Sequence, residues 1–195
     1  MKVRLFEIFT SVEGEGILYG TKTLFVRLAG CPFTCFYCDT KESLPLDSGT
    51  EYTIEDANQL IDSNLKEQTY KVNFTGGDPL IQYQAVALLA KHMQEKKIPT
   101  YLESSCFDID RFNHVLPFFD IIKIEFKTKD SDFVDSNHYK KLISHTLKCL
   151  ASSVKSKKTT FIKIVVSSKT KPNEFQELTN QIFSLISKNN IDGFI

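Results

Sequence analysis

The sequence has no excess of either charge. Lys plus Arg and Asp plus Glu number 24 each, so the chain lacks the basic surplus that follows a nucleic-acid backbone. It also lacks a run of about 18 apolar residues, the length that a membrane-spanning helix requires. No charged segment leading into an apolar stretch stands at the start of the chain, as an export signal would require. We therefore expect no direct nucleic-acid partner, no membrane span and a cytoplasmic location.

Cysteine is also scarce, and its five copies are unevenly placed. Cys31, Cys35 and Cys38 share one short stretch, whereas Cys106 and Cys149 lie far away. An odd number with three bunched together does not suit a disulfide framework. A structural zinc site usually needs a second Cys or His pair about a dozen or more residues further on. No such pair follows.

Three thiols leave one corner of a four-ligand metal site open. Iron–sulfur clusters are held by cysteine thiolates at such short spacings, and a [4Fe–4S] cube with three of them keeps one iron free for a small molecule. The natural candidate is S-adenosylmethionine, whose radical chemistry is cofactor-driven. A zinc site completed by a remote residue, and a thiol cluster without metal, are the alternatives.

Strand-like and helix-like periodicities alternate along the 195 residues, of which 42% are apolar. This is enough for a single α/β domain spanning residues 1–195. Strands are predicted at residues 3–9, 23–29, 70–75, 100–104, 121–126, 160–166 and 191–195. Helices fit the gaps, and residues 173–188 place an apolar stripe on one helical face. Strands that alternate with helices predict a parallel sheet.

The predicted strands have one apolar and one polar face. In residues 121–126 and just beyond, apolar side chains alternate with Lys123, Glu125 and Lys127, and side chains two apart share a face of a strand. Such a pattern does not suit a sheet covered by apolar layers on both sides. We expect helices on one face and a hydrophilic cleft on the other; a water-exposed face of an α+β sheet is the alternative.

The stretch Gly76-Gly77-Asp78-Pro79 falls where a strand should lead into a helix. Asp78 can cap a helix that starts with Pro79, because its carboxylate accepts orphan amide hydrogens and proline has none to donate. Capping alone does not explain the two glycines. Their lack of side chains suggests that a ligand approaches the backbone closely.

A second glycine-containing stretch, Ser11-Val-Glu-Gly-Glu-Gly16, places two carboxylates between glycines. The spacing does not match a dinucleotide-binding loop, and no helical pattern follows. Its carboxylates could accept hydrogen bonds from an amino-pyrimidinone edge. A turn-rich surface loop is the alternative.

Together with Arg27 and the Cys-Asp-Thr sequence that ends at Thr40, these motifs resemble the 7-carboxy-7-deazaguanine synthases. This resemblance implies an α/β fold: a partial, open (β/α)6-type radical S-adenosylmethionine barrel with a leading N-terminal strand, here ending at the sixth strand. The family uses a [4Fe–4S] cluster, S-adenosylmethionine and Mg²⁺ to convert 6-carboxy-5,6,7,8-tetrahydropterin into 7-carboxy-7-deazaguanine, with loss of ammonia. The product feeds queuosine or archaeosine, and hence tRNA modification.

The resemblance also implies site residues by position. The cluster ligands would be Cys31, Cys35 and Cys38, and the Mg²⁺ ligand Thr40. Contacts to S-adenosylmethionine would come from Tyr37, Asp39, Gly76, Gly77, Asp78, Glu103, Ser104, Lys127 and Thr128. Contacts to the pterin would come from Val12, Glu13, Gly14, Glu15, Arg27 and Thr75. No side chain is assigned as a catalytic acid, base or nucleophile.

The resemblance further implies an electron donor such as flavodoxin or ferredoxin and a homodimer. An activase that makes a glycyl radical on a partner protein shares the cysteine spacing and is the alternative enzyme. The glycine-flanked carboxylates and Thr40 favour the synthase, because an activase needs a peptide groove. A non-catalytic iron–sulfur module is the remaining alternative.

Overall fold

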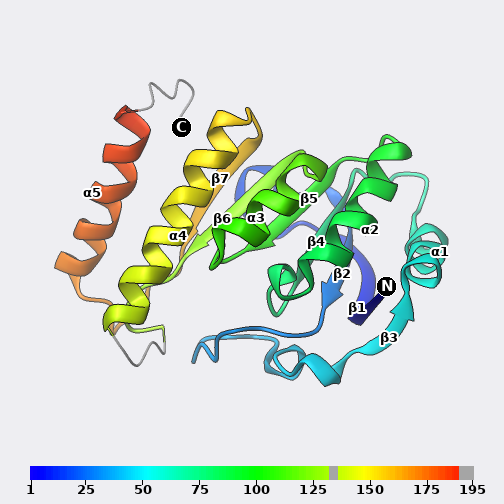
Figure 1. The fold of residues 1–195 in the computed structure, drawn as a ribbon, viewed down its shortest axis with the longest axis horizontal. Coiled ribbons are helices and arrows are strands. Elements are labelled where there is room, and N and C mark those ends of the chain that lie inside the picture. The colour runs from blue at the N-terminus through cyan, green and yellow to red at the C-terminus, as the bar shows by residue number, and fades with distance from the viewer. Residues whose placement is uncertain (132–135, 189–195) are drawn as a thin grey trace.

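The protein is described by a computed structural model over residues 1–131 and 136–188 (Figure 1). Its strands are β1 (Lys2–Val12), β2 (Lys22–Leu28), β3 (Thr50–Thr53), β4 (Lys71–Gly76), β5 (Thr100–Ser104), β6 (Ile121–Phe126) and β7 (Thr159–Ile164). Its α-helices are α1 (Ile54–Asn64), α2 (Tyr83–Glu95), α3 (Ile109–Val115), α4 (Ser136–Lys155) and α5 (Pro172–Lys188). Short 3₁₀ turns connect several of these elements.

All described strands join one sheet in the order β3-β1-β2-β4-β5-β6-β7. From β2 to β7 the neighbouring strands run parallel, and each parallel connection after β4 carries a helix. β1 pairs antiparallel with β2 and with β3. Within the described residues, the sheet therefore ends at β3 on one side and at β7 on the other. The predicted α/β fold with an open, partial barrel and a leading strand is confirmed.

The structure differs from the prediction mainly at the edges of the sheet. β1 continues to Val12 rather than ending at residue 9, and β3 was not predicted. β3 is four residues long and mostly exposed, so it has little of the apolar alternation by which strands are recognised. The strand predicted at residues 191–195 lies outside the described residues. Within the described part, no helix is long and apolar enough to cross a membrane.

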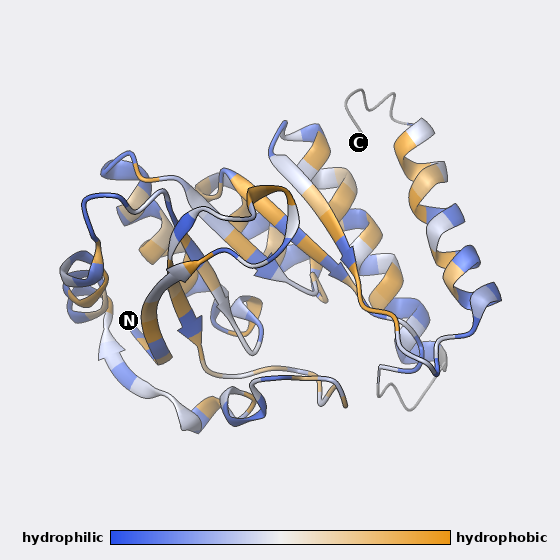
Figure 2. Ribbon diagram, turned by 180° about the vertical axis from the view of Figure 1, so that it is seen from behind, coloured by the Kyte–Doolittle hydropathy of each residue, from blue (hydrophilic) through white to orange (hydrophobic). Residues whose placement is uncertain are grey.

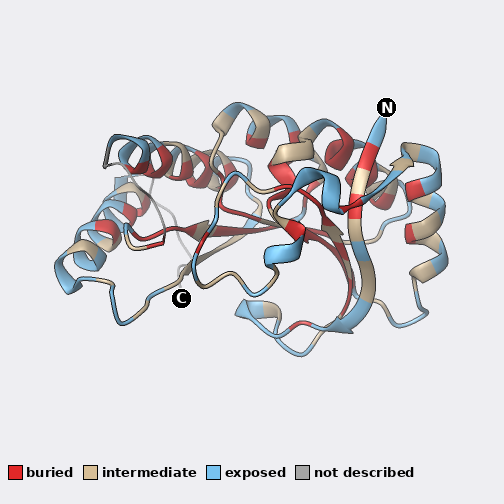
Figure 3. Cartoon of the chain, turned by 90° about the horizontal axis from the view of Figure 1, so that it is seen from below, coloured by how far each residue is buried: buried red, intermediate tan, exposed pale blue. Residues whose placement is uncertain are grey.

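The two faces of the sheet have different surroundings. On one face the helices pack against fully buried apolar side chains of the strands, such as Val26, Phe74 and Ile124. Figure 3 shows the helices gathered on this side of the curved sheet, with their buried residues turned toward it. Figure 2 shows the sheet from its other side, with each residue coloured by its hydropathy. Strand residues of the other parity, such as Asn73 and Lys123, are polar, so the opposite face is the polar one, as the alternation of side chains predicts.

Side chains at the helix starts set where the helices begin. The Thr53 hydroxyl accepts a hydrogen bond from the Asp56 amide at the start of α1. Asp108 does the same for two amides at the start of α3. The predicted cap at Asp78 is confirmed, because its carboxylate accepts the Leu80 amide in the 3₁₀ turn that precedes α2. Each cap satisfies amides that a helix cannot pair internally.

The two glycines at the end of β4 pack against the end of β2. The Gly77 amide donates to the Leu28 carbonyl at 3.1 Å, and the Asp78 amide donates to the Gly30 carbonyl at 2.8 Å. A Cβ at Gly76 or Gly77 would overlap the backbone oxygen of Leu28 or Gly30, respectively. The backbone that approaches these glycines closely is thus the chain's own. This contact joins the glycine turn to the start of the cysteine loop.

We predict that Gly77→Ala destabilises the chain, because its methyl group would overlap the Gly30 carbonyl, part of a hydrogen-bonded backbone that cannot swing aside. The free energy of unfolding should fall by roughly 2–3 kcal/mol, measured by chemical denaturation of the metal-free chain. Gly14→Ala is the matched control, since nothing lies within 4 Å of its Cβ position. Equal stabilities for the two variants would contradict the prediction.

Candidate active site

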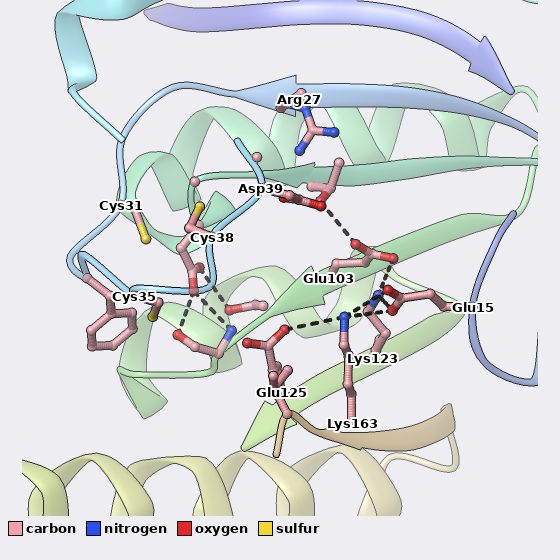
Figure 4. Close-up of a pocket in the computed structure, with 18 of the residues that line it drawn as sticks. Glu15, Arg27, Cys31, Cys35, Cys38, Asp39, Glu103, Lys123, Glu125 and Lys163 are labelled. Carbon is pink, nitrogen blue, oxygen red and sulfur yellow. Dashed lines mark hydrogen bonds and ion pairs between the residues drawn. The ribbon is translucent and has the colours of Figure 1, made fainter. Parts of the chain in front are cut away.

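A cavity of about 530 Å³ opens on the polar face of the sheet, beside the carboxyl ends of the parallel strands. In open α/β sheets this is the edge at which ligands bind. Figure 4 shows Cys31, Cys35 and Cys38 at one side of the cavity and Glu15 with Lys163 at the other. The hydrophilic cleft predicted from the strand pattern is confirmed.

The cysteine loop follows β2 directly and is held by its backbone. The Gly30 amide donates to the Ser43 carbonyl at 2.8 Å, and the Cys31 amide to the Leu44 carbonyl at 3.0 Å. Gly30 has a φ of +97°, a conformation that other residues adopt with strain. The loop therefore leaves the strand by a sharp turn, and its three thiols line the same cavity.

The environment of the loop disfavours free thiolates. Burial, together with the nearby Asp78 carboxylate, raises the pKa of Cys31 to about 12. Burial also raises the pKa of Cys35, although Lys127 acts in the opposite direction. A thiol with a raised pKa stays protonated at neutral pH, and a bound metal is what would deprotonate it.

The three thiols are ligands of the kind that an iron–sulfur cluster takes. Among residues 1–131 and 136–188, no three His, Cys, Asp or Glu side chains are grouped to hold one metal ion. A [4Fe–4S] cube places each cysteine on a different iron, so its thiols surround a volume instead of converging on a point. Thiolates are the ligands that such clusters take, and here all three border one cavity.

Asp78 is a buried residue of the cavity wall, and its carboxylate accepts four hydrogen bonds. One carboxylate oxygen accepts the Leu80 amide at 3.0 Å and the Ser104 hydroxyl at 2.8 Å. The other accepts the amide and the hydroxyl of Ser105, at 3.0 and 2.6 Å. Burial raises its pKa, and these four donors oppose that shift. Asp78 thereby ties the end of β4 to the end of β5.

Charged side chains alternate along the far side of the cavity. The ammonium of Lys123 lies 2.7 Å from Glu103 and 3.1 Å from Glu15. Lys163 lies 2.7 Å from Glu15 and 3.9 Å from Glu125. Burial tends to raise the pKa of Glu15, but the two lysines outweigh it and lower the pKa. The wall therefore presents acidic and basic side chains in alternation, held by ion pairs.

Lys127 extends this network to the cysteine loop. Its ammonium pairs with Glu125 and lies over the rings of Phe33 and Tyr37, at 5.9 and 5.4 Å from their centroids. Burial would lower the pKa of Lys127, but the Glu125 carboxylate and the Cys35 sulfur outweigh it and raise the pKa. A fixed positive charge thus stands beside the loop.

Arg27 projects from β2 into the cavity (Figure 4). Its Nε donates to Glu7 at 2.7 Å, and Glu7 is its partner across the β1–β2 pair. Among the described residues, its two terminal amino groups have no partner. They form the planar pair of donors that a carboxylate can accept side by side.

Most residues implied by the resemblance meet at this cavity. They are Glu13, Gly14, Glu15, Arg27, Cys31, Cys35, Tyr37, Cys38, Asp39, Thr75, Gly76, Gly77, Asp78, Glu103, Ser104 and Lys127. Val12, Thr40 and Thr128 are not part of its lining. The Thr40 hydroxyl donates to Asp39 at 3.0 Å, and the Thr128 hydroxyl is paired with Ser131.

Sequence reasoning left several site residues unassigned. Lys123, Glu125 and Lys163 belong to polar strand faces that the alternation reveals, yet none was assigned a role. Lys71 was overlooked entirely. It shares the parity of Asn73 and Thr75 on β4, so extending that alternation one step back along the strand would have found it.

Comparisons with known proteins show similar sequences and a similar fold. The family described as 4Fe-4S single cluster domain matches residues 12–146. The 7-carboxy-7-deazaguanine synthase of Archaeoglobus fulgidus is 31% identical over an alignment covering 100% of this chain and 83% of the relative. The 7-carboxy-7-deazaguanine synthase of Methanocaldococcus jannaschii is 30% identical over an alignment covering 84% of this chain and 71% of the relative. QueE from Escherichia coli superposes with a TM-score of 0.55 at 18% identity, covering 97% and 92% of the two chains, and so shares the fold.

The open α/β sheet and the three-cysteine loop at its carboxyl edge define an iron–sulfur protein of the radical S-adenosylmethionine class. Within that class, the chain belongs to the 7-carboxy-7-deazaguanine synthase family. The sequence resemblance is thereby confirmed.

We predict that Asp78→Asn destabilises the chain, because an amide cannot accept all four donors that now surround the buried carboxylate. The free energy of unfolding of the metal-free chain should fall by roughly 2–4 kcal/mol, measured by denaturant titration. Asp39→Asn is the control, since that carboxylate is exposed and borders the same cavity. A loss shared equally by both variants would show that the buried network contributes nothing.

Proposed function

We propose that this chain converts 6-carboxy-5,6,7,8-tetrahydropterin into 7-carboxy-7-deazaguanine, with loss of ammonia, in 7-deazapurine biosynthesis. The observation that carries the proposal is that the three thiols and the free amino groups of Arg27 border one cavity. A redox centre and an anion-binding group are thus within reach of the same small molecule. Whether the product enters queuosine or archaeosine is a property of other enzymes.

In this proposal Cys31, Cys35 and Cys38 hold the [4Fe–4S] cluster. When bound, the cluster and S-adenosylmethionine supply the radical that removes a hydrogen atom from the substrate. The chain contributes a loop fixed by backbone hydrogen bonds to residues 43 and 44. Such preorganisation keeps the reacting groups at a constant separation, which is what the chemistry requires of a protein.

We assign the S-adenosylmethionine contacts to the part of the cavity beside the cysteine loop. They comprise Tyr37, Asp39, Gly76, Gly77, Asp78, Glu103, Ser104, Lys127 and Thr128. Asp78 and Ser104 bond to each other at 2.8 Å, so they would support the cofactor site by holding the ends of β4 and β5. Gly77 lines the cavity with its backbone, and Lys127 offers a fixed positive charge.

We assign the pterin to the opposite part of the cavity. Arg27 would bind the carboxylate of the substrate with its two terminal amino groups. Glu13, Gly14 and Glu15, with Val12 before them, would face the amino-pyrimidinone ring, whose N–H groups need acceptors. The Thr75 hydroxyl donates to Glu103 at 3.0 Å, and its oxygen can still accept from the substrate. Residues that surround a small molecule in this way also exclude water.

We place the Mg²⁺ site at Thr40. A hydroxyl is a hard oxygen ligand, and the ion would need substrate oxygens and water to complete its octahedron. The Thr40 hydroxyl now donates to the carboxylate of Asp39, so a second oxygen lies beside it. The ion would orient the substrate and stabilise developing negative charge.

The remaining assignments follow from family membership. We propose that residues 1–195 act as one domain, that the protein works in the cytoplasm as a homodimer, and that a flavodoxin or ferredoxin supplies its electron. No nucleic acid is expected to bind directly, because acidic and basic residues balance at 24 each.

The test is an anaerobic assay of the cluster-reconstituted chain with S-adenosylmethionine, a reductant and Mg²⁺, with and without the carboxytetrahydropterin. We expect 5′-deoxyadenosine and 7-carboxy-7-deazaguanine to form together, more slowly when Mg²⁺ is left out. Cys35→Ala should lose bound iron and both products. Cys149→Ala is the matched control, because that thiol lies in the apolar core outside the cavity, and it should keep the iron and the activity.

Each outcome of the assay has a distinct meaning. Cleavage of S-adenosylmethionine without a deazaguanine product would keep the radical chemistry but reject the pterin as substrate. No cleavage by a chain with its full iron content would reject the enzyme assignment. Product formation that survives Cys35→Ala would reject the ligand assignment.

A second prediction concerns the carboxylate of the substrate. Arg27→Gln should raise the KM for the carboxytetrahydropterin by roughly 100-fold, because a charge-assisted, two-pronged hydrogen bond is lost. The affinity for tetrahydropterin without the carboxylate should not change. Arg4→Gln is the control, since Arg4 pairs with Glu51 outside the cavity. An equal loss of affinity for both pterins would show that Arg27 does not bind the carboxylate.

A further inference from the structure

Lys71, the first residue of β4, is a lysine whose side chain is 0% exposed. Lysine is rarely buried completely unless its charge is paired. Burial lowers the pKa of Lys71, and the Glu13 carboxylate opposes this shift. Lys71 is not among the residues that line the cavity, so it is not placed to touch a ligand. Its burial must therefore be explained by an effect on other residues.

The ammonium of Lys71 is fully engaged. It donates to Glu13 Oε2 at 3.0 Å, to the Thr23 hydroxyl at 2.5 Å and to the Thr21 hydroxyl at 3.1 Å. It also lies over the ring of Tyr101, 5.2 Å from the centroid. An ammonium has three hydrogens to donate, and here each has an acceptor. Its position is thus defined from several sides.

Glu13 is the one residue of the described part of the chain that forms an ion pair with Lys71, and it borders the cavity. The side chain of Glu13 is only 4% exposed. Both of its hydrogen bonds, from Lys71 and from Asn73 at 3.4 Å, go to Oε2. Among the described residues, Oε1 has no partner. One carboxylate oxygen is therefore fixed from below, and the other is left for a ligand.

Glu15, two residues after Glu13, differs from it in exposure and in the number of bonded carboxylate oxygens. Its side chain is 50% exposed, and its two oxygens are engaged by Lys123 and Lys163. Solvent and two competing cations leave it less suited to direct recognition of a neutral ring. Glu13 is buried and has hydrogen bonds to only one of its two oxygens, so it is the better placed of the two to accept from a ligand.

A buried ion pair seldom adds stability, because desolvation of both charges offsets their attraction. Removing one partner alone is costly, since a buried charge is left without compensation. A chain that keeps such a pair beside a cavity gains a carboxylate that is fixed in direction. This advantage concerns binding rather than folding.

We propose that Lys71 is a positioning residue that holds the Glu13 carboxylate in place, with Oε1 directed at the N–H groups of the pterin's amino-pyrimidinone edge. The inference rests on the proposed function, because it names the recognition of the same substrate. Lys71 acts only through Glu13. Its loss should weaken pterin binding without affecting S-adenosylmethionine, which is assigned to the other part of the cavity.

The test compares the wild-type chain with Lys71→Met, Glu13→Gln and the double variant, each matched for iron content. Lys71→Met should raise the KM for the carboxytetrahydropterin about tenfold, the loss expected for one charged hydrogen bond. The kcat and the affinity for S-adenosylmethionine should stay within about twofold. Lys91→Met is the control for losing a lysine, since its weak partner Glu95 lies on the exposed side of α2.

The double variant separates positioning from support of the fold. In the Glu13→Gln background, adding Lys71→Met should change the KM less than about twofold, because the charge through which Lys71 acts is gone. A tenfold rise in both backgrounds would overturn the proposal. So would an unchanged KM in Lys71→Met, or a joint fall of kcat, S-adenosylmethionine affinity and thermal stability. If Lys71→Met does not fold, Lys71→Gln replaces it in both backgrounds, and the same contrast between the backgrounds is expected.

Failure of the inference can be told apart from failure of the proposed function. If the wild-type chain forms the product while Lys71→Met has the same KM as the wild type, only the role of Lys71 is overturned. If the wild-type chain forms no product, the KM cannot be measured. The dissociation constant of the carboxytetrahydropterin, measured anaerobically at equilibrium without reductant, is then compared among the same variants.

Discussion

The candidate active site depends on the backbone contact between the ends of β2 and β4. Two hydrogen bonds, from the amides of Gly77 and Asp78 to the carbonyls of Leu28 and Gly30, bring the glycine turn against the cysteine loop. Because no side chain fits between the two backbones, the segments assigned to the cluster and to S-adenosylmethionine lie at a fixed separation. Asp78 extends this constraint to β5 through Ser104 and Ser105.

Charge pairing organises the other half of the cavity. Lysines from β4, β6 and β7 each bond to a carboxylate from the segment of Glu13 and Glu15 or from a neighbouring strand. Each pair satisfies charges that burial would otherwise penalise. The glycine-containing loop is therefore tied to the sheet by ion pairs at distances that sequence proximity could not impose. A rigid polar wall suits a reaction in which placement of the substrate matters more than acid–base chemistry.

Much of this could be predicted from the sequence because the signals are local. The spacing of Cys31, Cys35 and Cys38 indicates a cluster, and the alternation of apolar with charged residues in β6 predicts which face is polar. The cap formed by Asp78 before Pro79 is likewise a matter of adjacent residues. β3 could not be predicted, because a short exposed edge strand buries too little to leave an apolar pattern.

Local sequence patterns are enough to predict the class of fold, the cluster-binding loop and the family, since each depends on residues that are close along the chain. Which charges meet depends instead on how the chain folds. Lys71 and Glu13 are separated by 58 positions and Lys163 and Glu15 by 148, and no local pattern states which lysine faces which carboxylate. Strand register and the path of the loop bring these partners together. The pairing is decided by the cost of burying an unpaired charge, and that cost arises only once the sheet has formed.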